Sequence, residues 1–269
     1  MFDDRPIGVF DSGVGGLTVL DALRRRLPGE SFLYLGDTAR LPYGTKSPET
    51  VRRYARQAAG KLIERGVKLL VIACNTASAV AVEDLALAFA PVPVIGVIEP
   101  GAEAACAATK TGHVVVIGTE GTVRGGAYQR AIARRRPDIR VDALACPLFV
   151  ALAEEGWVEG AIVEAVARRY LEPLLADIGH GRVDALVLGC THFPVLRGAI
   201  QRVCGEGVVL VDSAETTAQS VESALRGQGR SGRGTTRFLA TDAPERFARV
   251  GAVFLVGGAR ADEVELVDL

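Results

Sequence analysis

The sequence predicts an α/β protein made of two related halves, and two observations lead to this fold class. Short apolar runs alternate with helical patterns along the 269 residues, which favours parallel sheets joined by right-handed crossovers. An approximate internal repeat then aligns "KLLVIAC" (68–74) with "DALVLGC" (184–190). In each half a strand and a glycine-containing loop come first, in "IGVFDSGVGG" (7–16) and "VVVIGTEGTV" (114–123).

The predicted strands are apolar runs that do not alternate with polar residues. Such runs are typical of parallel strands that are covered on both faces. In chain order, the predicted strands span residues 7–10, 31–36, 69–73, 92–97, 113–118, 185–189, 208–212 and 237–241.

The clearest predicted helix spans residues 48–66, where apolar side chains recur at helical spacing. Ser47 suits its N-cap, Pro48 its first position and Gly66 its C-terminal stop. A similar pattern predicts a helix over residues 158–175.

The composition describes a folded protein without a strong charge. Hydrophobic residues make up 49% of the chain and the net charge is -1, so we expect no nucleic-acid or membrane partner. The runs Arg24–Arg26 and Arg134–Arg136 are expected on solvated helix faces. The N-terminus "MFDDRPIGVF" has no long apolar segment, and no run approaches the ~20 apolar residues of a membrane helix. We therefore expect a cytoplasmic protein. Separately, the segment "RGQGRSGRG" (226–234) is expected to form a flexible loop.

The five cysteines form no CxxC pair. An odd number of unpaired cysteines argues against a disulfide framework and against a structural zinc site. No His, Cys and carboxylate spacing supplies three ligands, so we expect no metal. Cys106, Cys146 and Cys204 are interpreted as structural, because free cysteine is among the residues most often buried.

Cys74 and Cys190 stand in a different context, because each directly follows a predicted strand. Ligands of open α/β sheets bind at the carboxyl ends of strands. Asn75 and Thr76 open a predicted helix after the first thiol, and Thr191 or His192 leads into a helix started by Pro194 after the second. A helix N-terminus lowers the pKa of a cysteine and offers free N–H groups to carboxylates.

Other strand ends supply polar candidates. The loop "DSGVGG" (11–16) lacks both the GxGxxG spacing and a P-loop lysine, but it allows close approach of a small anion. Asp11 begins this loop at a strand end. The loop "GDTARLPYG" (36–44) and the segment "GTEGT" (118–122) follow two more strands. His192 lies two residues after the second thiol and could orient it or exchange a proton with it.

Two thiols on opposite sides of a cleft could invert a stereocentre, one removing a proton and the other delivering one. Two rival classes remain open. A thiol hydrolase or transferase would use one cysteine as a nucleophile, and an α/β binding protein would use neither. A pyridoxal-phosphate racemase is disfavoured, because no lysine sits at a convincing strand end.

The chain resembles the glutamate racemase family, within the aspartate/glutamate racemase superfamily, nearly from end to end. The segments that carry the resemblance are "IGVFDSGVGGLTVL", "YLGDTARLPYGTKS", "ACNTASA", "GVIEPGA", "VIGTEGTV", "LFVALAEEG", "GCTHFP" and "VDSAE". Phe193 stands where many relatives have tyrosine, and "ALAEEG" replaces a commoner "PLVE".

The resemblance implies a cofactor-independent 1,1-proton transfer between L- and D-glutamate that supplies D-glutamate for peptidoglycan, in a homodimer. It assigns Cys74 to deprotonation of D-glutamate and Cys190 to L-glutamate. It places Asp11 beside the first thiol and His192 beside the second. A further supporting carboxylate is Glu154, with Glu155 as the competing assignment. The implied substrate contacts are Asp11, Ser12, Pro42, Tyr43, Gly44, Asn75, Thr76, Thr119, Thr122, Thr191 and His192.

The same resemblance implies two pseudo-symmetric domains, each a mainly parallel sheet flanked by helices, with the active site in the cleft between them. We expect the first domain at residues 1–97 plus 210–269 and the second at 98–209. The nearest alternative is a racemase of the same superfamily that acts on aspartate or another small amino acid.

Overall fold

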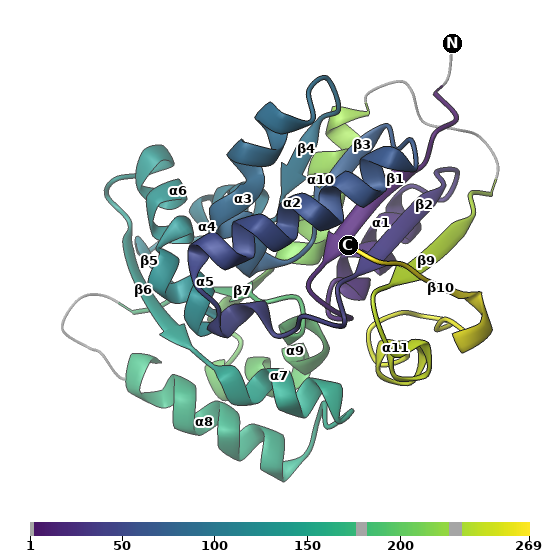
Figure 1. The fold of residues 1–269 in the computed structure, drawn as a ribbon. Coiled ribbons are helices and arrows are strands. Elements are labelled where there is room, and N and C mark those ends of the chain that lie inside the picture. The colour runs from purple at the N-terminus through teal and green to yellow at the C-terminus, as the bar shows by residue number, and fades with distance from the viewer. Residues whose placement is uncertain (1–2, 176–181, 226–232) are drawn as a thin grey trace.

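The structure is a computed structural model that describes residues 3–175, 182–225 and 233–269. Two parallel sheets with helices around them form two domains (Figure 1), as the sequence predicted. The first sheet has the strand order β10-β9-β2-β1-β3-β4, and the second has the order β6-β5-β7-β8. Every pair of neighbouring strands is parallel.

The first sheet contains β1 (Ile7–Asp11), β2 (Phe32–Gly36), β3 (Leu69–Ile72), β4 (Val94–Gly96), β9 (Thr236–Ala240) and β10 (Val264–Leu266). The second contains β5 (His113–Gly118), β6 (Arg140–Ala145), β7 (Ala185–Gly189) and β8 (Val209–Asp212).

The α-helices of the described residues are α1 (Leu17–Arg26), α2 (Pro48–Glu64), α3 (Asn75–Ala88), α4 (Ile98–Ala108), α5 (Glu120–Gly125), α6 (Ala127–Arg135), α7 (Pro147–Glu154), α8 (Ala161–Leu175), α9 (Arg197–Cys204), α10 (Ser213–Ala224) and α11 (Pro244–Gly251). Short 3-10 helices are η1 (Tyr43–Thr45), η3 (Phe193–Leu196) and η4 (Ala261–Glu263). Within these described ranges, no helix has the length and apolarity needed to cross a membrane.

Each sheet is buried on both faces. In β5, Val115 and Ile117 belong to one hydrophobic cluster while Val114 and Val116 belong to the cluster on the other face. The first sheet is likewise enclosed by two clusters. Burial on both faces explains why these strands read as unbroken apolar runs.

The predicted strands are confirmed to within a residue or two, but two strands were missed. β6 is half-buried along its whole length and carries Arg140 and Asp142, so it does not read as an apolar run. β10 has three residues at the edge of its sheet, two of them exposed. Edge strands bury less side-chain area, which weakens their hydrophobic signal.

The predicted caps of α2 are present. The Ser47 side chain accepts a hydrogen bond from the Thr50 backbone N–H, and Gly66 has a φ of 74°. The second predicted helix begins at Ala161 rather than 158. Most of the predicted loop over 226–234 lies outside the described residues.

The C-terminal part of the chain returns to the first domain through α10, which packs against α1. Arg25 and Arg26 on α1 pair with Glu215 and Glu222 on α10, so this arginine run joins two helices at the surface. β8 continues to Asp212, past residue 209, and the domain bounds given above stay a prediction.

Alanine substitutions at two glycines, one inside α2 and one directly after it, should have opposite effects on stability. Gly60 lies inside α2, and an added Cβ would have its nearest neighbour, Phe89 Cζ, at 3.8 Å. Gly60→Ala should therefore raise the free energy of unfolding by about 0.5–1 kcal/mol. Gly66→Ala should lower it by about 1 kcal/mol, because its φ of 74° strains any L side chain. Urea unfolding measures both, and shifts of the same sign would contradict this account.

Candidate active site

A cavity of about 180 Å³ lies between the two domains and receives both thiols. Of the sequence-predicted site residues, the structure brings together at its walls Ser12, Pro42, Tyr43, Gly44, Cys74, Asn75, Thr76, Thr119, Glu154, Cys190, Thr191 and His192. Asp11 and Thr122 do not line the cavity. Both are buried behind the residues that do.

Cys74 forms the N-cap of α3, directly beyond the end of β3. Its Sγ accepts from the Ala77 backbone N–H at 3.4 Å and donates to Ser12 Oγ at 3.4 Å. The side chain is 5% exposed. The first thiol is therefore held by one hydrogen bond from its own helix and one to the loop after β1.

The expected lowering of the Cys74 pKa by the helix N-terminus is wrong. Burial, and then the charge of Asp11, raise the pKa of Cys74 to about 12. A helix N-terminus stabilises a thiolate by about 1 kcal/mol, and removal from water outweighs that gain. Cys74 is consequently a neutral thiol at neutral pH.

Asp11 ends β1 and is completely buried. Its Oδ2 accepts from the Gly13 backbone N–H at 2.9 Å. Burial raises the pKa of Asp11, and the nearby charge of His192 opposes that rise. Gly16 allows the tight packing here, because an added Cβ would lie 2.5 Å from Asp11 Cβ.

Cys190 follows β7, but the predicted α-helix does not begin beside it. A turn leads to η3, and α9 begins only at Arg197. Pro194, which was expected to start the α-helix, instead occupies the second position of the 3-10 helix η3. The N-terminus of an α-helix therefore does not act on the second thiol, which depends on a side chain instead.

That side chain is His192. Its Nδ1 lies 3.8 Å from Cys190 Sγ, and its Nε2 lies 3.2 Å from Glu154 Oε1. Burial lowers the pKa of His192, but the hydrogen bonds with Cys190 and Glu154 raise it more, to about 10. His192 is then an imidazolium at neutral pH, so a cation lies directly beside the Sγ of Cys190.

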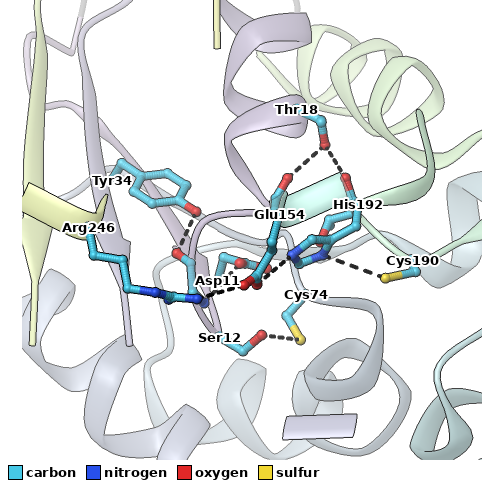
Figure 2. A network of polar contacts seen from close by, with 12 residues as sticks. Asp11, Ser12, Thr18, Tyr34, Cys74, Glu154, Cys190, His192 and Arg246 are labelled. Carbon is cyan, nitrogen blue, oxygen red and sulfur yellow. Dashed lines mark hydrogen bonds and ion pairs between the residues drawn. The ribbon is translucent and has the colours of Figure 1, made fainter. Parts of the chain in front are cut away.

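Glu154 lies at the end of α7 and binds two partners with separate oxygens (Figure 2). While Oε1 meets His192, Oε2 accepts from Arg246 Nη2 at 2.7 Å. The hydrogen bond with His192 and the charge of Arg246 lower the pKa of Glu154. The structure thus places Glu154 at the imidazole, whereas Glu155 is exposed.

Small residues close the cavity where the domains meet. The Oγ1 atoms of Thr76 and Thr119 lie 2.9 Å apart, and Thr122 Oγ1 is 3.1 Å from that of Thr119. Gly44 packs on Thr119, at a distance where an added Cβ would be 2.8 Å from Thr119 Cβ. Tyr43 is buried and donates its hydroxyl hydrogen bond to Asp37, which fixes the loop before η1.

Three side chains at the site went unrecognised in the sequence. Arg246 reaches Glu154 from α11, Tyr128 Oη accepts from Asn75 Nδ2 at 2.9 Å, and Thr18 Oγ1 donates to the Thr191 carbonyl at 2.9 Å. None of the three directly follows a strand end, and only Thr18 lies in a segment that carries the family resemblance. Their partners lie 53 to 173 residues away, so spacing gave no signal.

The remaining cysteines do not line this cavity. Cys146 and Cys204 belong to a hydrophobic cluster of the second domain, and Cys106 is partly buried in α4. In the part of the chain that the structure describes, no group of three His, Cys, Asp or Glu side chains could hold a metal ion. The fold and this site define a two-domain α/β protein with one thiol on each wall of a shared cavity.

The comparisons with known proteins agree with this class. The family model for Asp/Glu/Hydantoin racemase matches residues 7–221. The chain is 52% identical to a glutamate racemase of Geobacter metallireducens over 94% of this chain and 93% of the relative. The chain therefore belongs to the Asp/Glu/Hydantoin racemase family, a family of isomerases, and its strong relatives are glutamate racemases.

Solved structures show the same fold. Glutamate racemase from Thermus thermophilus, in complex with beta-chloro-D-alanine, has a TM-score of 0.87 at 50% identity, covering 99% of this chain and 98% of that one. Glutamate racemase from Francisella tularensis, in complex with D-glutamate, has a TM-score of 0.89 at 39% identity and covers 98% of both chains.

The different environments of the two thiols predict different reactivity. Alkylation by iodoacetamide requires a thiolate, so Cys190 beside its imidazolium should react faster at pH 7 than Cys74. His192→Ala should slow alkylation at Cys190 and leave Cys74 nearly unchanged. Peptide mapping by mass spectrometry measures both rates. Equal rates at the two thiols, or no effect of His192→Ala, would contradict this assignment.

Proposed function

We propose that this protein racemises glutamate without a cofactor, by a 1,1-proton transfer between two thiols. The observation that carries the proposal is that Cys74 and Cys190 come from different domains and line one cavity. A planar carbanion has two faces, and inversion requires a base on one face and an acid on the other. The D-glutamate bound in the Francisella relative supports glutamate as the substrate.

The surroundings of the two thiols suit this exchange, because Cys74 is a neutral thiol that can give a proton and the His192 imidazolium lies beside Cys190. With L-glutamate, the Cys190 thiolate removes the α-proton: the C–H bond breaks and an S–H bond forms. The neutral Cys74 thiol then donates its proton to the opposite face, which gives D-glutamate. In the reverse direction Cys74 is the base and Cys190 the acid, with Asp11 beside the first thiol and His192 beside the second.

The rest of the cavity can bind the carboxylates. The N-terminus of α3 opens at Asn75 and Thr76, and free N–H groups at a helix N-terminus attract anions. Ser12 and Thr119 add hydroxyl groups on the two walls. We assign the substrate contacts to the predicted residues that line the cavity, which are Ser12, Pro42, Tyr43, Gly44, Asn75, Thr76, Thr119, Thr191 and His192. Asp11 and Thr122 are buried behind them and would act through these residues.

We also propose a setting for this activity. The product D-glutamate would supply peptidoglycan synthesis in the cytoplasm, and the active species would be a homodimer. The domains would be residues 1–97 plus 210–269 and residues 98–209. The support for this setting is the membership of the chain in a family with bacterial glutamate racemases.

The proposal predicts that the protein alone racemises L-glutamate. Circular dichroism of the amino acid should decay to zero without added cofactor. Cys74→Ala and Cys190→Ala should each lower the rate by at least about 10²–10⁴-fold, the usual contribution of a general acid or base. Cys106→Ala is the matched control and should keep the wild-type rate.

Aspartate, assayed in parallel, distinguishes the nearest rival. If aspartate reacted faster than glutamate, aspartate would be the preferred substrate and the assignment of glutamate would be wrong. Full activity in either variant of the two cavity thiols would rule out the two-thiol mechanism, and an inactive wild-type protein would rule out the proposed function.

Glu154 should set the alkaline limit of activity. Its carboxylate stabilises the His192 imidazolium and helps to raise the pKa of His192 to about 10. Glu154→Gln removes that charge, so the pKa of His192 should fall and the imidazolium should be lost at lower pH. The alkaline limb of the kcat/KM profile should therefore move to lower pH. Glu155→Gln is the control, and an unmoved limb in Glu154→Gln would contradict this role.

A further inference from the structure

We propose that Arg246 is a positioning residue for the second thiol: it holds the Glu154 carboxylate in the orientation that supports His192. The inference deepens the proposed racemase function and rests on it. Arg246 does not line the cavity, and its ion pair is with Glu154. It acts through Glu154. Arg246 belongs to the first domain and Glu154 to the second.

The contacts form one chain from α11 to the thiol (Figure 2). Arg246 Nη2 donates to Glu154 Oε2 at 2.7 Å, Glu154 Oε1 lies 3.2 Å from His192 Nε2, and His192 Nδ1 lies 3.8 Å from Cys190. Each carboxylate oxygen has its own cationic partner. Rotation of the carboxylate would therefore break both contacts, so the arginine fixes the oxygen that faces the imidazole.

The helix that carries Arg246 is itself anchored at the site. The next residue, Phe247, is completely buried, and its ring lies 5.9 Å from that of Tyr34. The Tyr34 hydroxyl in turn donates to the carbonyl of Gly13, in the loop after Asp11. The α11 backbone at Arg246 is consequently held against the loop that follows β1, and Ser12 of that loop accepts a hydrogen bond from Cys74.

The first domain also contacts the imidazole directly. Phe254, shortly after α11, meets the His192 ring edge-on with centroids 5.1 Å apart. His192 is therefore held on one side by an aromatic ring and at Nε2 by the carboxylate that Arg246 orients. Both restraints come from the C-terminal segment of the first domain.

Simple electrostatic stabilisation does not account for this arrangement. The side chain of Arg246 is 41% exposed and that of Glu154 is 20% exposed. Water screens a pair of this kind, and exposed ion pairs contribute little to stability. We therefore assign the pair a geometric role, because it fixes the Glu154 carboxylate at hydrogen-bonding distance from His192. A small misplacement of a group at a reacting centre lowers the reaction rate strongly.

The test compares Arg246→Ala with Arg249→Ala. Arg249 lies on the same helix and is exposed, so its variant should behave as wild type. Arg246→Ala should lower kcat/KM by between about 10-fold and 100-fold, and Arg246→Lys should restore part of the loss by returning a cation. Thermal unfolding should be nearly the same in all three variants.

Isotope effects separate positioning from a general structural defect. The equilibrium constant between enantiomers is one, so any variant must lower kcat/KM equally in both directions. If Arg246 supports the second thiol, proton transfer at Cys190 becomes more rate-limiting. The deuterium isotope effect should then rise with L-[2-²H]glutamate and fall with D-[2-²H]glutamate. Isotope effects that change alike for both enantiomers would overturn the proposal, as would Arg246→Ala behaving like Arg249→Ala.

Alkylation of the thiols tests the same residue without a substrate. Arg246→Ala should slow the reaction of iodoacetamide with Cys190 and leave Cys74 unchanged. This result would support the positioning role even if the wild-type protein failed to racemise glutamate, which would refute only the proposed function. An unchanged rate at Cys190 would overturn the inference.

Discussion

The site depends on the close packing of two strand-end loops that belong to different sheets. Thr18, at the start of α1, donates to the carbonyl of Thr191 at 2.9 Å. Gly15 makes the approach possible, because an added Cβ would lie 2.4 Å from the His192 ring and 2.6 Å from Thr191 Oγ1. This contact brings the turn of the second thiol against the loop of Asp11, so that both thiols line the same cavity.

Because the domains meet there, Asp11 and His192 are buried, and the charges near them act more strongly on one another than they would in water. Both thiols are 5% exposed, yet their surroundings differ. Cys74 has a buried carboxyl group nearby, which raises its pKa further. Cys190 has an imidazolium that is itself supported by a carboxylate and an arginine. Two related strand–cysteine units therefore give the same residue type two different electrostatic environments.

Much of this fold could be predicted from the sequence, because strands that are buried on both faces leave unbroken apolar runs. The edge strand β6 did not leave one, because its side chains are only partly buried and include Arg140 and Asp142. At the site, the residues that follow strand ends were recognised, including Cys74 and His192. The carboxylate assignment was left open between neighbours, and only the direction of the side chains places Glu154 at the imidazole.

Two features of the site depend on tertiary structure that sequence spacing does not encode. Arg246 lies 92 residues from Glu154, and nothing in the segment around it signals a role. The pKa of Cys74 was expected to fall because a helix begins there, which is a local argument. Its rise comes from burial and from Asp11, a residue of another strand that only the folded chain brings near.

The central claim is that the two thiols act on opposite faces of one carbon. Its most direct test is the racemisation of L-glutamate in D2O, with the deuterium content of each enantiomer measured early in the reaction. Two bases predict deuterium at Cα of the D-glutamate formed and almost none in the remaining L-glutamate. Early deuterium in the remaining L-glutamate, or product D-glutamate that retains the substrate proton, would indicate a single base that serves both faces and would contradict the account.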